Sequence, residues 1–350
     1  MASLLENAFA KETLLASNGY DPFFLDVNTK VDHETALSAS MKENLPKVEG
    51  NGKGILNYTN LSVLYDAQRR VPFYSAYNID GSSKVKVTRT AFRPDPRIDL
   101  DIQLSQHGFY DLRTDITEFE IGHMAANNEM AWGSNAQLQA YQTFHFPNSA
   151  PQAEKLNTGI WKALERYIID EAATLNRNRR ISVFTGPLLR KDDPAYIRDP
   201  GFQIPLLFFK VIVFPTAKGL YTTGFMMSHE QKMIEQEMFV KQPVERGAIA
   251  RTIEEPRFDD FKYKKVFQVS IPFLEQQTGL NFSWKDVMPV AVPNDKNQIQ
   301  KIEKIKDSKD AEEAERELRR GCIPKMREAK EEITPREERT KNFKLNIILP

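Results

Sequence analysis

The chain has 350 residues, 41% of them hydrophobic, and its 48 basic residues balance its 48 acidic residues. This length allows one sizeable core with extensions, or two small domains. The zero net charge argues against a large, uniformly basic surface, but a local basic cleft remains compatible with it because phosphate binding depends on where charges lie.

Cysteine usage and hydropathy exclude further classes of protein. The single cysteine, Cys322, excludes internal disulfides and cysteine-based zinc sites, and the five histidines form no cluster with metal-ligand spacing. No apolar run reaches about 18 residues, so we expect no transmembrane helix and no membrane partner. The first residues lack a basic region followed by an apolar core, so no standard signal peptide is expected. This pattern fits a cytoplasmic protein, or one exported by another route.

The predicted organisation has three parts. Residues 1–54 are an N-terminal extension, with a short helix at 8–16 and a flexible linker at 49–54. This extension either packs on the core or regulates access to it. Residues 55–293 form the main domain. Residues 294–350 are predicted to be a charged, helical C-terminal extension, because Lys, Glu, Asp and Arg dominate its composition.

Apolar segments bounded by turn residues predict a strand-rich main domain. Residues 61–65 and 72–79 indicate a hairpin, and residues 84–89 a third strand. Four further strands are expected, at 181–187, 205–214, 220–227 and 266–271. A connector helix at 229–239 and a short helix after Pro272 complete the pattern, which favours an α+β fold with a mostly antiparallel sheet and packed helices.

The most specific chemistry is expected between residues 119 and 165. His123 follows Gly122, whose missing side chain lets backbone or ligand approach closely. A neutral imidazole can act as a general base near pH 7. The other histidines of this region have simpler explanations. His107 is expected on the surface of a loop, and His145, which lies in an aromatic segment, is expected to be structural.

Asn157 opens a helical pattern, in which apolar residues recur at helical spacing. An asparagine there is usually a helix cap, and considered alone the cap is favoured over a metal ligand. Its amide oxygen is nevertheless a donor that Mg²⁺ accepts. Glu165 lies two turns further, roughly 12 Å along the axis. We therefore expect Glu165 to orient a hydrated ion, or to be a solvated carboxylate, and not to share one tight coordination sphere with Asn157.

Three segments carry a resemblance to a known family. Residues 120–123 read Glu-Ile-Gly-His, residues 148–152 read Asn-Ser-Ala-Pro-Gln, and residues 156–165 read Leu-Asn-Thr-Gly-Ile-Trp-Lys-Ala-Leu-Glu. In this order and spacing they resemble the DNA/RNA non-specific endonucleases, the ββα-metal nucleases that include endonuclease G. The last two segments match the family motifs completely. The first matches only the second half of the family's Asp-Arg-Gly-His. The resemblance covers about residues 55–290.

The resemblance implies a ββα-metal nuclease site in residues 55–293, with DNA and/or RNA as substrate. His123 is implied as the general base, Asn157 as the metal ligand and Glu165 as the supporting carboxylate. The implied cofactor is Mg²⁺, with Mn²⁺ as an alternative. Arg89 is the best match to the family's phosphate-contacting arginine, with Arg93 as the alternative. Either arginine is equally well explained as a solvated surface residue.

One position departs from the family pattern. Ile121 stands where the family has arginine, and it cannot contribute charge toward a phosphate. We still expect an active enzyme, because His123 and Asn157 are present. The competing hypotheses are a nuclease-derived module that binds nucleic acid or protein without catalysis, and a metal-dependent phosphoesterase for a smaller substrate. A homodimer and an inhibitor or partner protein are left open.

Overall fold

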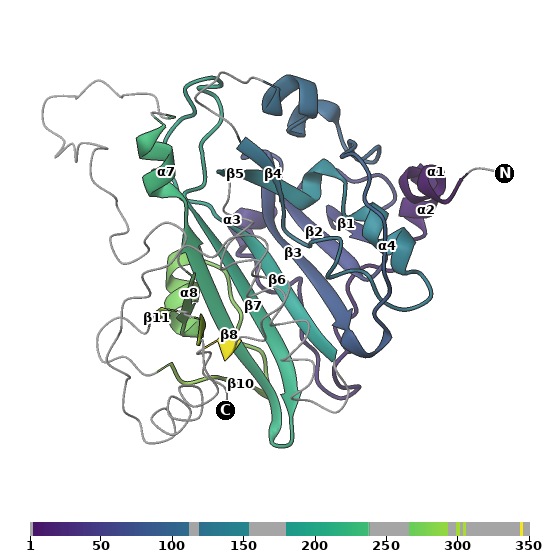
Figure 1. The fold of residues 1–350 in the computed structure, drawn as a ribbon, viewed down its shortest axis with the longest axis vertical. Coiled ribbons are helices and arrows are strands. Elements are labelled where there is room, and N and C mark those ends of the chain that lie inside the picture. Colours follow the sequence, from purple (N-terminus) through teal and green to yellow (C-terminus); the bar gives the residue numbers. More distant parts are fainter. Residues whose placement is uncertain are drawn as a thin grey trace, which may run out of the picture.

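The structure is a computed structural model, and it describes residues 3–111, 119–153, 180–236, 238, 266–292, 299–301, 304–305 and 344–345. In these residues nine strands form one sheet, and β4 and β5 form a separate two-stranded ribbon. Short helices pack around both (Figure 1). The expected α+β fold with a mostly antiparallel sheet is confirmed. No helix in the described part of the chain is long and apolar enough to cross a membrane.

Neighbouring strands of the sheet are antiparallel, except for one parallel pair. Its order is β1 (Ile55–Tyr58), β2 (Leu61–Asp66), β3 (Val71–Asp80), β6 (Arg180–Leu188), β7 (Leu207–Thr216), β8 (Gly219–Ser228), β9 (Val266–Val269) and β11 (Ile299–Lys301). β10 (Val287–Pro289) pairs in parallel with the first half of β8, and β9 pairs with its second half. The long β7 and β8 cross the centre of the molecule (Figure 1).

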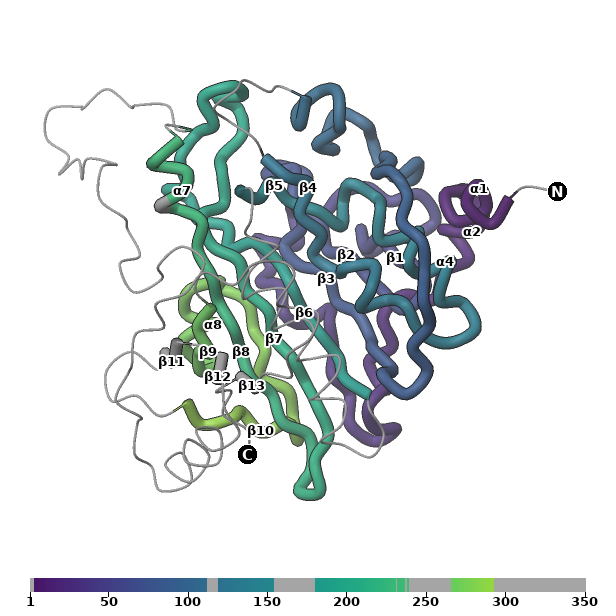
Figure 2. Tube along the Cα trace, in the orientation of Figure 1, coloured from purple at the N-terminus to yellow at the C-terminus, as the bar shows by residue number. Residues whose placement is uncertain are grey.

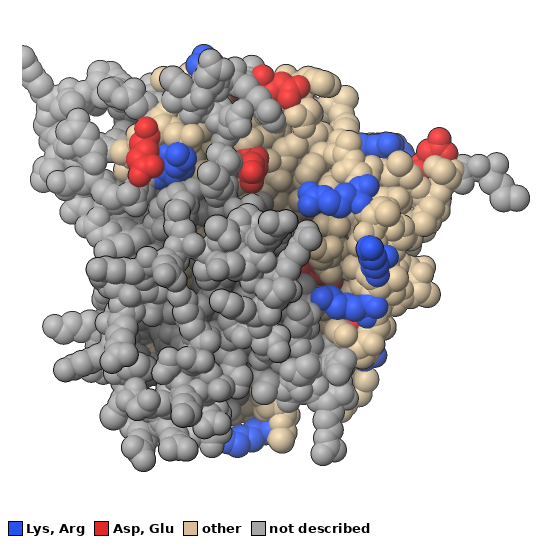
Figure 3. Space-filling model, viewed as in Figure 1, with Lys and Arg blue, Asp and Glu red and all other residues tan. Residues whose placement is uncertain are grey.

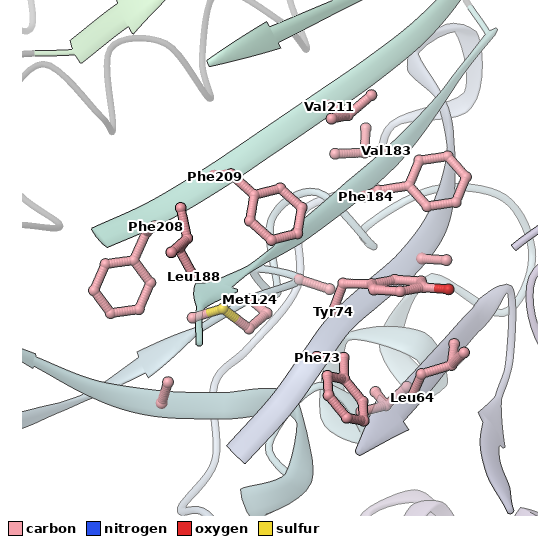
Figure 4. Close-up of a cluster of buried hydrophobic side chains, with 14 of the residues drawn as sticks. Leu64, Phe73, Tyr74, Met124, Val183, Phe184, Leu188, Phe208, Phe209 and Val211 are labelled. Atoms are coloured by element: carbon pink, nitrogen blue, oxygen red, sulfur yellow. The ribbon is translucent and has the colours of Figure 1, made fainter. Parts of the chain in front are cut away.

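The core lies against the central strands. β2 is buried along its whole length, and β7 is buried from Leu207 to Phe214. Such strands are expected from continuous apolar runs, because both faces of the sheet are covered. Figure 4 shows Phe208, Phe209 and Leu188 packed with Met124, which comes from outside the sheet. The strands predicted at 61–65, 72–79, 181–187, 205–214, 220–227 and 266–271 are all present, with shifted ends.

The third strand predicted at 84–89 is wrong. Only Lys84 makes a strand-like bridge there, to Trp132. β3 is already paired on one side with β2 and on the other with β6, so no edge is left for the chain that follows it. Residues 84–93 instead run along α4 (Ala136–Gln142) without regular structure.

The ribbon consists of β4 (Phe119–His123) and β5 (Ser149–Ala153), paired in antiparallel fashion. The remaining α-helices of the described ranges are short. They are α1 (Leu4–Phe9), α2 (Lys11–Leu15), α3 (Ala39–Lys42), α7 (Glu230–Glu235) and α8 (Ile271–Thr278). Single turns of tighter or wider helix occupy Gly81–Ser83, Leu100–Ile102, Gln106–Tyr110 and Phe146–Asn148. The helix after Pro272 is therefore present as α8, and the connector helix as the shorter α7.

The N-terminal segment packs on the core. The Tyr74 hydroxyl donates to the His33 carbonyl, and the Trp284 indole donates to the Asp32 carbonyl at 2.8 Å. The amide of Asn281 donates to the carbonyl of Ala36 at 2.9 Å. α1 and α2 lie beside α4 at the edge of the molecule (Figure 2). Of the two explanations offered by the sequence, packing on the core is therefore observed for the described residues.

The predicted C-terminal extension is described only in short pieces. β11 extends the main sheet, and β12 (Lys304–Ile305) pairs with β13 (Lys344–Leu345). The charged extension was expected to be helical, and β11 and β12 near its start are strands instead. Residues 342–350 have strand-like apolar content in the sequence, and β13 is a strand within them. The other residues of 294–350 lie outside the described part of the chain.

Candidate active site

His123 is the last residue of β4, and it lies opposite Ser149 of β5. The chain then turns away from the ribbon, and Met124 enters the core, where Figure 4 shows it next to Leu188 and Phe209. The amide of Met124 donates to the carbonyl of Asn148 at 2.9 Å. The position of His123 is therefore fixed on one side by strand pairing and on the other by a buried methionine.

The Asn148 side chain holds the turn that follows His123. Its oxygen accepts from the Ala125 amide at 3.1 Å and from the Ser75 hydroxyl at 2.7 Å. Its nitrogen donates to the carbonyls of Ala125 and Thr143, both at 2.9 Å. All four hydrogen bonds are buried, and losing a buried partner is costly. Asn148 thus joins β3, the turn after His123 and the turn before β5.

A buried ion pair supports the same turn from the central sheet. Lys210 on β7 donates to Glu129 at 2.8 Å, and both side chains are buried. Glu129 also accepts from the Tyr77 hydroxyl at 2.8 Å and from the Ala126 amide at 3.0 Å. Because these groups complete one another's hydrogen bonds, the charges are tolerated inside the protein. The network ties the segment after His123 to β3 and β7.

Two aromatic rings enclose the His123 imidazole. The ring centroid of Phe92 lies 4.5 Å from that of His123, and the Phe144 ring meets it edge-on at 4.7 Å. Burial, together with the positive charge of Arg89, lowers the pKa of His123 to about 3. Its Nε2 is buried and has no hydrogen-bond partner among the residues that the structure describes. His123 is thus a neutral imidazole with one free nitrogen.

The two candidate arginines differ in their surroundings. The guanidinium carbon of Arg89 lies 5.6 Å from the ring centroid of Phe144, the ring that also contacts His123. The guanidinium carbon of Arg93 lies 4.6 Å from the ring centroid of Phe9. Since Arg89 also lowers the pKa of His123, its charge is felt at the imidazole. The structure thus places Arg89 near His123, whereas the Arg93 guanidinium lies against Phe9 of α1.

The absence of a side chain at Gly122 leaves space for the side chain of Gln152, and not for a close approach of backbone. Gln152 comes from the neighbouring strand, and a Cβ on Gly122 would lie 2.2 Å from its amide carbon and oxygen. The Gln152 side chain is buried, and within the described ranges its oxygen has no hydrogen-bond partner. The close approach expected at Gly122 is therefore made by the last residue of the 148–152 motif.

The end of β5 is fixed by a further histidine. The Ala153 amide donates to His229 Nδ1 at 3.1 Å, and His229 Nε2 donates to the Pro205 carbonyl at 2.7 Å. Both bonds need the same neutral tautomer. Burial lowers the pKa of His229 to about 4, which keeps that tautomer at neutral pH. The chain leaves this anchor toward residue 157.

Asn157 and Glu165, together with the helix predicted around them, lie outside the described residues. Of the four predicted site residues, the structure therefore places only His123 and Arg89. Within the part of the chain that is described, no three His, Cys, Asp or Glu side chains gather in a way that could hold a metal ion. Asn157 as the metal ligand and Glu165 as the supporting carboxylate remain predictions, and their oxygens are the donor type that Mg²⁺ prefers.

The other two histidines discussed from the sequence lie where they were expected. His145 is fully buried, donates from Nδ1 to the Gln142 carbonyl at 2.9 Å, and packs against the ring of Tyr58. His107 is exposed and bonds Asp111 at 2.7 Å. Neither ring contacts His123 among the aromatic contacts of the described residues.

The sequence reasoning missed several residues that shape this site. Phe92 and Phe144 were not singled out as its walls, and His229 was not connected with β5. Asn148 and Gln152 were quoted only as motif residues. Their positions in a matched motif were a usable signal, whereas the contacts of Phe92 and His229 depend on chain segments far away in sequence.

Comparisons with known proteins assign the chain to a family. The sequence model of the DNA/RNA non-specific endonucleases matches residues 43–286, starting before the predicted boundary at residue 55. The chain belongs to this family.

Two individual proteins are similar to the chain. The "Uncharacterized protein y4fB" of Sinorhizobium fredii is 29% identical over 275 residues, which cover 76% of this chain and 39% of that protein. The chain thus matches well under half the length of this relative. The crystal structure of the EndoG/EndoGI complex, which concerns the mechanism of EndoG inhibition, has 22% identity and a TM-score of 0.46. It covers 65% of this chain and 84% of the other.

Proposed function

We propose that this protein is a metal-dependent endonuclease that hydrolyses phosphodiester bonds of DNA and/or RNA with little sequence specificity. Membership of the non-specific endonuclease family supports this proposal. The observation that carries it is His123, a neutral imidazole fixed by strand pairing at the end of β4, whose Nε2 has no partner in the described part of the chain.

In this proposal His123 takes a proton from the water that attacks phosphorus. The imidazole must be neutral to accept a proton, and the lowered pKa keeps it neutral at physiological pH. A bound phosphodiester is anionic, and a nearby negative charge favours the imidazolium. Substrate binding is therefore expected to raise the basicity of His123 toward the range that proton transfer requires.

Arg89 is proposed to supply positive charge near the scissile phosphate. Its guanidinium lies beside Phe144, which contacts the base. Ile121 packs against the core and brings no charge. Arg89 would thus supply part of the charge that the family's motif arginine provides, because preorganised charge in a site stabilises the developing negative charge.

Asn157 and Glu165 are proposed to hold the metal ion, with Asn157 as ligand and Glu165 as the supporting carboxylate. Mg²⁺ suits such oxygen donors, and Mn²⁺ is the alternative. When bound, the ion would stabilise negative charge on phosphate and leaving oxygens. His229 contributes indirectly, because it anchors Ala153 four residues before Asn157.

A catalytically inactive binding module is the alternative function. The specific observation in its favour is Ile121, an apolar and partly buried residue in the place of the motif arginine. This alternative predicts binding of nucleic acid or protein that is unaffected when His123 is replaced, and no strand cleavage.

The test is degradation of supercoiled plasmid and single-stranded RNA with Mg²⁺, with Mn²⁺ or with chelator. We expect cleavage that needs the metal and falls about 100-fold to 10,000-fold in His123→Ala. His107→Ala is the matched control, because this exposed histidine should leave the rate unchanged. Cleavage that survives His123→Ala would contradict the assigned base. No cleavage by the wild type with several divalent ions would favour the binding module.

A further inference from the structure

A line of basic side chains leads away from the candidate base. We call residues 84–93 the basic strap. Its Lys86, Arg89 and Arg93 are exposed, and Lys84 at its start is exposed as well. Figure 3 shows Lys and Arg side chains in a row on the part of the surface that holds α4 in Figure 1. This part of the surface is therefore basic, although the chain as a whole has zero net charge.

The strap is held along its length. Near its start, the Val85 amide donates to the Ala131 carbonyl at 2.8 Å. In its middle, Thr88 exchanges two hydrogen bonds with the Gln137 side chain, at 2.9 and 3.1 Å. At its end, the Arg93 amide donates to the Phe144 carbonyl at 2.9 Å. Its cations therefore project from a fixed backbone, which reduces the entropy lost when a ligand binds.

The strap passes the candidate base. Phe92 packs on the His123 ring, and Arg89 lies over Phe144, which contacts the same ring. Lys86 lies three residues before Arg89 and Arg93 four residues after it. Basic side chains therefore flank Arg89 on both sides in the sequence, and that of Arg93 extends toward Phe9 of α1.

The strap itself carries no carboxylate. No acidic residue occurs between Lys84 and Pro94, and the next one, Asp95, is buried and paired with Arg97 at 2.8 Å. Glu6 lies close enough to Arg93 for that positive charge to help lower the pKa of the carboxyl, after its hydrogen bonds with Ser3. Lys86 is thus the cleaner position at which to test binding.

We propose that the basic strap binds the sugar-phosphate backbone of a nucleic-acid strand beyond the scissile bond. This inference rests on the proposed nuclease function. Ten residues span at most about 30 Å, since an extended chain rises about 3.3 Å per residue. Phosphates of one strand in a duplex repeat every 3.4 Å or so along the axis, so the strap is long enough to follow several nucleotides. Such contacts position the strand without reading its bases.

The proposal is tested by comparing a long and a short substrate. The variants are Lys86→Gln, Arg93→Gln and the double variant, with Lys218→Gln at the exposed turn between β7 and β8 as the control for charge. We measure kcat/KM for a 30-nucleotide strand and for a thymidine 5′-phosphate nitrophenyl ester, as a function of salt. The ratio of the two values is expected to fall about tenfold in the double variant and to stay constant in Lys218→Gln. The salt slope on the long strand should decrease by about 0.7 for each lost contact.

Binding in chelator separates this inference from the proposed function. Fluorescence anisotropy of a labelled 30-nucleotide strand needs no catalysis and can be measured with wild type and variants. Weaker binding in the double variant, with a smaller salt slope, supports the strap even if the wild type cleaves nothing. A substrate ratio and a binding slope that match those of Lys218→Gln would overturn it. Wild-type binding to an acidic protein, and not to the labelled strand, would overturn it as well.

Discussion

The charge of Arg89 has two opposing effects on the basicity of His123. The positive charge of Arg89 helps lower the pKa of His123, because it disfavours a second positive charge nearby. The same charge is proposed to attract the phosphodiester whose negative charge favours the imidazolium. The basicity of His123 would therefore depend on whether substrate is bound, which limits proton uptake by the free protein.

Arg89→Gln tests this coupling. We expect the pKa of His123 to rise in the metal-free protein, because burial remains and the charge is removed. We also expect kcat/KM for nucleic acid to fall about 10-fold to 100-fold, because one preorganised cation is lost. NMR titration of the His123 ring and initial rates measure the two effects. The titration should be unchanged in Arg93→Gln, whose guanidinium lies over Phe9. An unchanged His123 titration in Arg89→Gln would show that the two residues are not coupled.

At the scale of elements, the β4–β5 ribbon determines where the base lies. The buried side chain of Gln152 lies over Gly122. The ribbon therefore depends on the absence of a side chain at residue 122. Overpacking at such a position forces neighbouring side chains to move.

Gly122→Ala is expected to destabilise the protein by about 1–3 kcal/mol, because the new methyl group overlaps Gln152. The cost should be smaller in the Gln152→Ala background, since the overlapping atoms are gone. Urea denaturation of the two single variants and the double variant measures this coupling. Gly52→Ala is the matched control, because a Cβ there meets no atom within 4 Å. Equal costs of Gly122→Ala in both backgrounds would contradict the packing explanation.

The elements also show how far the sequence could be interpreted. The strand at 205–214 was predictable because both faces are apolar, and His123 stood out because a partial motif precedes it. The extra strand at 84–89 was not excluded by local pattern. This strand does not form because β3 already has a neighbour on each side. One of these neighbours, β6, comes about a hundred residues later in the chain. Sheet order of this kind is decided by packing between distant segments and not by local propensity.

At the scale of the whole molecule, acid should weaken the fold. Four of the five histidines are held neutral by burial, which lowers their pKa. They are His33, His123, His145 and His229. Below about pH 6.5 the unfolded chain takes up protons at these positions and the folded protein does not. The free energy of unfolding therefore falls as pH decreases from about 6.5 toward the folded pKa values. For His123 and His229, whose folded pKa values are about 3 and about 4, the loss is on the order of 1 kcal/mol each by pH 5.5.

Urea denaturation at pH 7.5, 6.5 and 5.5 measures this loss. Asp66 and Asp193 act in the opposite direction, because burial raises the pKa of each carboxyl. The Gln side chain also has a donor and an acceptor for the hydrogen bonds of His229. His229→Gln should therefore lower by about one the number of protons that the protein takes up on unfolding in acid. A pH dependence that is the same in His229→Gln as in the wild type would show that His229 is not buried as a neutral group.

The contacts of the N-terminal segment have a consequence for folding during synthesis. Asp32 accepts from the indole of Trp284 across 252 residues of chain. Residues 20–36 emerge from the ribosome early, but the side chains that bury them belong partly to β3 and partly to residues 280–284. Contacts between such distant segments close slowly, because the intervening loop must be ordered first. Tyr20, whose ring packs on Phe184, and the residues around Asp32 and Ala36, which bond Trp284 and Asn281, therefore lack these partners until those segments have been made. In that interval they are the surface on which a chaperone would act.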